Sequence, residues 1–148
     1  MPNPEFKFPN DYGKYFDAAG VLKVDYLTDL PERIAETLKH EWPALTMTQL
    51  RAFYMHAKRT EEAWRRGVSL GKASALAEAV NEIKRFEYLA NDRLKLKKKI
   101  PQTFHDFLCK NAKNVNAEDG GKSLKAFLEH FEALVGFCAG RIKERDRT

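Results

Sequence analysis

The sequence predicts an all-α protein, a compact single-domain helical bundle of about five helices that spans residues 1–148, with an irregular N-terminal arm at 1–25. Three observations support this fold class. Apolar residues recur every three or four positions along long segments, which is the pattern of amphipathic helices. Glycine and proline fall mostly at segment edges, and no run alternates apolar and polar residues long enough to predict a sheet. With 148 residues, 43% of them apolar, the chain can bury one sizeable core.

The first 25 residues combine helix-breaking residues with aromatic rings. The breakers are Pro2, Pro4, Pro9, Gly13 and Gly20, and the rings belong to Phe6, Phe8, Tyr12, Tyr15 and Phe16. Because large rings gain from burial, this arm is expected to cover the chain's own core in preference to latching onto another molecule. Both interpretations stay open at this point.

The first two helices have boundary signals in the sequence. A short helix is expected near Pro31, a residue suited to a first helical turn, and should end at residues 42–43. The next helix begins at Thr46, whose side chain can cap it. Gln49, three residues on, can return a hydrogen bond to the Thr46 amide, so the two form a capping box. This helix is predicted to end just before Gly67, which opens the small and polar run GVSLGK.

Three further helices are expected in the second half of the chain. The third spans roughly residues 73–94 and runs into the lysine-rich segment LKLKKKIP. The fourth follows Pro101 and ends before a polar connection that contains Gly120 and Gly121. The last, at residues 124–142, has the most regular apolar stripe in the chain. Such a stripe is typical of a helix at the centre of a bundle.

Residues that could support catalysis or bind a metal form no recognisable arrangement. His105 and Cys109 are four residues apart and could share a helix face, but no second helix offers a matching pair of ligands. No nucleophile stands near a base, and GVSLGK lacks the first glycine and the Ser or Thr of a phosphate-binding loop. We therefore expect no enzymatic activity, no metal and no cofactor. His56 and His130 are expected at the surface.

The two cysteines lie on helix faces, and the sequence has neither a secretory signal nor an apolar run as long as a membrane span. These features favour a reduced, cytoplasmic protein without a membrane partner.

Positive charge is concentrated in two places, which predicts a polyanionic partner. The chain has a formal net charge of +5, and residues 84–99 hold seven cations against two acids. Arg51, Lys58 and Arg65 are seven residues apart and therefore line one edge of the second helix at intervals of roughly 10 Å. Such surfaces bind nucleic acid or an acidic protein. A helical adaptor whose basic face binds an acidic protein partner is accordingly the alternative to RNA binding.

Three blocks of the sequence resemble the small subunit of the CRISPR type III-A (Csm) effector complex. They are LTMTQLRAFYMHAKR at residues 45–59, IKRFEYLANDRLKLKKKIPQTFHDFL at 83–108 and LKAFLEHFEALVGFCAGR at 124–141, in the order and spacing of the family. The N-terminal arm and residues 67–72 lie outside this resemblance.

The resemblance implies a non-catalytic subunit of an antiviral defence complex, which stacks with copies of itself and with other Csm subunits into a filament. It also implies binding along the guide RNA–target RNA duplex, mainly to the backbone of the target strand, with single-stranded DNA as a further candidate ligand. The residues expected to bind RNA are Gln49, Arg51, Lys58, Lys84, Arg93 and Lys95. For Gln49, the capping box by itself already explains why a glutamine stands at this position.

Overall fold

The computed structural model describes residues 6–92 and 99–144, and its regular elements are helices. A short 3-10 helix, η1 (Val24–Tyr26), is followed by α1 (Asp29–His40), α2 (Met47–Ser69), α3 (Ala75–Lys84), α4 (Phe86–Asn91), α5 (Gln102–Asn114) and α6 (Lys122–Cys138). Within the two described ranges, the one β-type pairing is an isolated bridge between Phe16 and Leu22. The predicted all-α bundle is confirmed.

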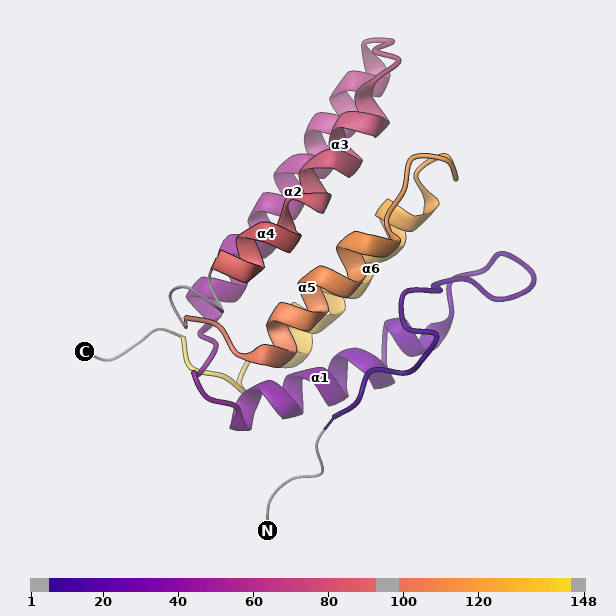
Figure 1. The fold of residues 1–148 in the computed structure, drawn as a ribbon. Coiled ribbons are helices and arrows are strands. Elements are labelled where there is room, and N and C mark those ends of the chain that lie inside the picture. Colours follow the sequence, from indigo (N-terminus) through magenta and orange to yellow (C-terminus); the bar gives the residue numbers. More distant parts are fainter. Residues whose placement is uncertain (1–5, 93–98, 145–148) are drawn as a thin grey trace.

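The helices form two hairpins that lie side by side (Figure 1). One hairpin consists of α2 and the α3–α4 pair, and the other consists of α5 and α6. The hairpins meet where α4 packs on α5 and α2 packs on α6, while α1 runs across α6. As a result, α2 and α3 extend away from α1 and leave one side of α2 uncovered.

Gly67 does not end the second helix, so the predicted boundary was wrong. α2 continues to Ser69, and Gly67 is buried inside it. A Cβ atom at Gly67 would lie 2.7 Å from the Cβ of Ala75, the first residue of α3. The absent side chain therefore allows the end of α2 to approach the start of α3 closely. The chain reverses later, around Gly71, whose φ is +74°.

The third predicted helix is divided in two at Arg85. The amide of Arg85 is shared between the carbonyls of Asn81 and Glu82, each 3.3 Å away, and α4 starts at the next residue. That residue, Phe86, is fully buried and packs edge-on against Phe53. The break thus coincides with an aromatic side chain that anchors α4 to α2.

The core is centred on α5 and α6 and is largely aromatic. Phe104, Phe107, Phe127 and Phe131 have no exposed surface, and their ring centroids lie 5.2–6.4 Å apart in mostly tilted and edge-to-face pairs. These separations suit favourable aromatic contacts. The prediction that the last helix lies at the centre of the bundle is confirmed.

The N-terminal arm covers this core, as the preferred interpretation of its aromatic residues predicted. Tyr12 and Tyr15 are buried, and both connect through hydrogen bonds to Asn111 of α5. The hydroxyl of Tyr15 donates to Asn111 Oδ1 over 2.6 Å, and Asn111 Nδ2 donates to the oxygen of Tyr12 over 2.8 Å. Buried hydroxyl groups need such partners.

His130 continues this chain of hydrogen bonds and is fully buried, so its predicted surface position was wrong. Its Nδ1 lies 2.6 Å from the backbone carbonyl of Tyr26, which can only accept, and Nδ1 therefore carries the proton. Nε2 accepts from the Tyr12 hydroxyl over 2.7 Å. Burial lowers the pKa of His130 to about 4, despite the opposing effect of the Tyr26 carbonyl.

No helix in the described part of the chain is both long enough and apolar enough to cross a membrane.

Candidate nucleic-acid interface

The start of α2 is built as the capping box that the sequence predicted. Gln49 N–H donates to Thr46 Oγ1 over 3.1 Å, and Thr46 N–H donates to Gln49 Oε1 over 3.0 Å. The other end of the Gln49 amide donates to the backbone carbonyl of Lys99 over 2.8 Å. Gln49 is therefore engaged at both of its polar atoms, in capping the helix and in holding the end of the lysine-rich segment.

Arg51 lies two residues further along α2 and forms an ion pair with Glu144, near the C-terminus. Arg51 Nη1 is 2.9 Å from Glu144 Oε2, and the two side chains are 52% and 69% exposed. Residues 143 and 144 also accept hydrogen bonds from the amides of Met47 and Thr48. The C-terminal segment therefore covers the first turn of α2.

Lys58 and Arg65, which share the predicted edge with Arg51, both pair with Glu61. Lys58 Nζ lies 2.7 Å from Glu61 Oε1, and Arg65 Nη2 lies 3.4 Å from Glu61 Oε2. The Glu61 side chain is only 8% exposed, so the two cations compensate a carboxylate that is poorly hydrated. The hydrogen bond with Glu61 raises the pKa of Lys58. The ion pair of Lys58 with the buried Glu61 is therefore harder to break than that of Arg51 with the exposed Glu144.

Lys84 lies at the end of α3 and reaches the neighbouring hairpin. Its Nζ donates to the carbonyl of Ala112, in the last turn of α5, over 3.0 Å. A cation at this position satisfies a helix carbonyl and complements the helix dipole. Arg93 and Lys95, the other two predicted contacts, lie outside the described residues.

Two exposed arginines of α2 were missed by the sequence reasoning. Arg59 and Arg66 are exposed and make no ion pair with any residue in the ranges 6–92 and 99–144. Each directly follows a residue of the predicted edge, Lys58 or Arg65. At 100° per residue, the cations at positions 51, 58, 59, 65 and 66 fall within a sector of about 120° around the helix. The same seven-residue spacing relates Arg59 to Arg66, so the sequence pattern that identified Arg51, Lys58 and Arg65 could also have identified these two arginines.

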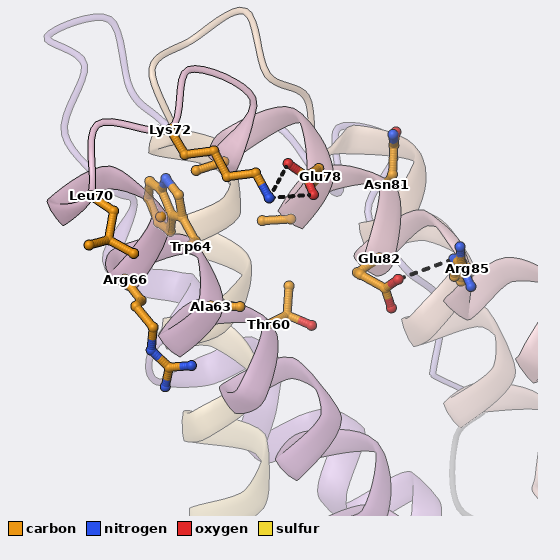
Figure 2. A pocket seen from close by; sticks show the side chains of 13 residues that line it. Thr60, Ala63, Trp64, Arg66, Leu70, Lys72, Glu78, Asn81, Glu82 and Arg85 are labelled. Carbon is orange, nitrogen blue, oxygen red and sulfur yellow. Dashed lines mark hydrogen bonds and ion pairs between the residues drawn. The ribbon is translucent and has the colours of Figure 1, made fainter.

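Arg66 also borders a groove between α2 and α3, which has a volume of about 500 Å³ (Figure 2). The residues that line it include small ones such as Ala63, Gly67 and Ala79. On the wall formed by α3 and the turn before it, charges are paired, as Figure 2 shows for Lys72 with Glu78 and for Arg85 with Glu82. The groove is thus mixed in character, lined by small residues, by paired charges and by Arg66.

The histidine and cysteine predicted to share a helix face do so. His105 Nε2 lies 3.6 Å from Cys109 Sγ and 2.6 Å from Asn91 Oδ1, and Nδ1 lies 3.0 Å from Asp106 Oδ1. Both ring nitrogens of His105 therefore have side-chain neighbours from the protein itself. Among the described residues, no three His, Cys, Asp or Glu side chains are grouped so that they could hold a metal ion.

The chain matches a known protein family. A family model described as Csm2 Type III-A matches residues 22–139, and this range includes the segment 67–72 that the sequence blocks left out. No curated protein and no solved structure matches the chain.

Proposed function

Because the chain belongs to the Csm2 type III-A family, it is a small subunit of a type III-A CRISPR effector complex, and we propose that it binds the target RNA backbone there without catalysis. Family membership also places it in association with other Csm subunits. In the proposed role, several copies stack along the guide–target duplex, and each copy adds a few phosphate contacts. Many weak contacts in one assembly give strong binding, because later contacts form at high effective concentration.

The observation that carries the proposed RNA binding is the series of cations along one side of α2. From Arg51 to Arg66 the helix rises about 22 Å, and the helical backbone fixes the spacing of the arginines between these positions. Arginine can bind phosphate through two parallel hydrogen bonds. Phosphate contacts hold RNA without reading its sequence, which suits a subunit that must accept any target.

The internal ion pairs suggest an order among the proposed RNA contacts. Arg51 is the leading candidate, because an ion pair between two exposed side chains is weak and can be exchanged for a phosphate. Lys58 is less available because Glu61 is poorly hydrated and needs its cations. Gln49 is the least available, since the capping box and Lys99 occupy its amide. The remaining proposed contacts are Arg59, Arg66, Lys84, Arg93 and Lys95.

Exposed apolar side chains support the proposed stacking. They occur at the end of α2, where it joins the α2–α3 connection, and in the segment around η1, which lie apart in the structure (Figure 1). Two different patches on one molecule allow head-to-tail contacts, and such contacts build open arrays. The side chains concerned are Val68 and Leu70 in the first region and Val21, Val24 and Leu27 in the second.

The proposed RNA binding can be tested by replacing Arg51 with alanine in the assembled effector complex. We expect weaker binding of target RNA and a smaller dependence of affinity on salt, because each lost phosphate contact removes about 0.7 from the salt slope on a single strand. Lys14→Ala is the matched control, since Lys14 is an exposed cation of the N-terminal arm without an ion pair to a described residue. Native mass spectrometry would verify that the number of copies is unchanged. Equal affinity and equal salt slope for Arg51→Ala and the wild type would contradict the assignment.

A further inference from the structure

The chain's own C-terminal segment occupies the start of α2. Met47 N–H donates to the carbonyl of Lys143 over 2.6 Å, and Thr48 N–H donates to the carbonyl of Glu144 over 3.0 Å. The Thr48 hydroxyl donates to the same Glu144 carbonyl over 2.8 Å. The first amides of a helix have no partner within the helix, so residues 143 and 144 supply acceptors that α2 would otherwise lack.

These backbone contacts determine where the Glu144 carboxylate lies. They hold Glu144 against the first turn of α2, and from there Oε2 reaches Arg51 Nη1 over 2.9 Å. Three of the four contacts between the segment and α2 involve backbone carbonyls, and they do not depend on the charge of Glu144. A carboxylate is therefore fixed next to the cation that is the leading candidate for an RNA phosphate.

The carboxylate and a phosphate would compete for the same guanidinium. Both are anions that bind arginine through oxygen atoms, and Arg51 cannot lose its charge. The ion pair is exposed, so Glu144 can be displaced from Arg51. Its backbone contacts would still keep the displaced carboxylate close to Arg51, where it can bind the guanidinium again.

We propose that Glu144 competes with RNA phosphates for Arg51 and so sets the RNA affinity of each copy below the value that Arg51 alone would give. This inference rests on the proposed role of Arg51 in RNA binding. It assigns Glu144 as an affinity-determining residue, because it acts on the RNA through Arg51. In an array of several copies, a small effect in each copy multiplies across the array.

The test is to measure target RNA binding by assembled complexes that carry Glu144→Gln. Glutamine keeps the size of the side chain and leaves the backbone contacts of residues 143–144 in place, while it removes the charge. We expect RNA affinity to rise by about two- to five-fold for each copy that contacts RNA, the range that corresponds to an exposed ion pair. The control is Glu118→Gln, which makes the same change of net charge at an exposed residue of the α5–α6 connection.

The double variant Arg51→Ala/Glu144→Gln decides whether the effect passes through Arg51. If the inference holds, the double variant binds RNA as Arg51→Ala does, because the competitor has nothing left to compete for. Equal gains from Glu144→Gln and Glu118→Gln would overturn the inference, and so would a gain that persists without Arg51. In either case, weaker binding by Arg51→Ala would leave the proposed function standing. An unchanged affinity of Arg51→Ala would refute the proposed role of Arg51 and this inference with it.

Discussion

The buried His130 makes the stability of this protein depend on pH in a window where most carboxylates do not titrate. Protonation of its ring would place a second donor opposite the Tyr12 hydroxyl, which already donates to Nε2. The imidazolium would also be desolvated, and this burial is the main reason why the pKa of His130 is lowered to about 4. Acidification is therefore the perturbation that should expose the role of His130.

The size of the effect follows from the two pKa values. An unfolded chain binds the His130 proton with a pKa near 6.5, while the folded protein binds it near 4. Between these values the unfolded state holds more protons, so stability falls as the pH falls. The full difference is about 3 kcal/mol, of which about 2 kcal/mol should already be lost at pH 5. Above pH 7 this residue should cause no further change.

The assay is urea denaturation of the full chain, followed by circular dichroism, at several pH values between 5 and 7. This window avoids the carboxylates of Glu36 and Glu78. A hydrogen bond from Arg141 lowers the pKa of Glu36, and hydrogen bonds, mainly from Ser74, lower the pKa of Glu78. The stability that these two carboxylates contribute is therefore lost only at more acidic pH.

His130→Gln removes the titrating group and should flatten the pH dependence, whatever its effect on stability at pH 7. His40→Gln, at an exposed position of α1, controls for the loss of a histidine. If the wild type and His130→Gln lose stability equally between pH 7 and pH 5, the reasoning about the buried ring is refuted.

Two further substitutions and one chemical probe test the packing. Gly121→Ala should lower the free energy of unfolding by about 2–4 kcal/mol, because φ is +96° there and the new Cβ would lie 2.5 Å from the Trp64 ring. Gly120→Ala, with a φ of +72° but open space, should cost only about 1–2 kcal/mol, and equal losses of thermal stability would argue against the clash. Burial raises the pKa of Cys138 to about 12, so its alkylation at pH 8 should be at least about tenfold slower in the folded protein than in the protein unfolded in urea, as followed by mass spectrometry. Comparable rates in the two states would show that Cys138 is accessible in the folded protein.

Features that depend on neighbouring residues could be predicted from the sequence. The capping box needs a Thr and a Gln three positions apart, and Thr46 and Gln49 form it as expected. The apolar stripe of α6 likewise placed that helix at the centre of the bundle, because a helix with so wide an apolar face must be covered on most sides. Both conclusions rest on spacing within a single helix.

The ion-pair partners of the candidate RNA-binding cations could be predicted from the sequence only where they lie on the same helix. Arg51 pairs with a residue 93 positions away, and no local pattern indicates that pairing. Lys58 and Arg65 pair with Glu61 at the short spacings typical of one helix, so these ion pairs could be predicted from the sequence. The burial of Glu61 could not be predicted, because it depends on how α2 packs against other helices.

His130 and Gly67 were misjudged for a related reason. Glu129 beside His130 suggested a polar surface, but the ring is buried by the N-terminal arm, which lies more than 100 residues earlier in the chain. Gly67 looked like a helix end because glycine often is one. Its actual role is to let Ala75 approach, which only the packing of α2 against α3 reveals.

The hydrogen bonds of the N-terminal arm bear on where the folding unit begins. The family match starts at residue 22, and a shortened chain beginning there would lack Tyr12 and Tyr15. Asn111 would then lose both tyrosine hydroxyl groups as hydrogen-bond partners next to the core, and His130 would lose that of Tyr12. Unpaired polar groups in such a place are costly. The segment that identifies the family is therefore shorter than the segment that must be expressed to obtain an intact core.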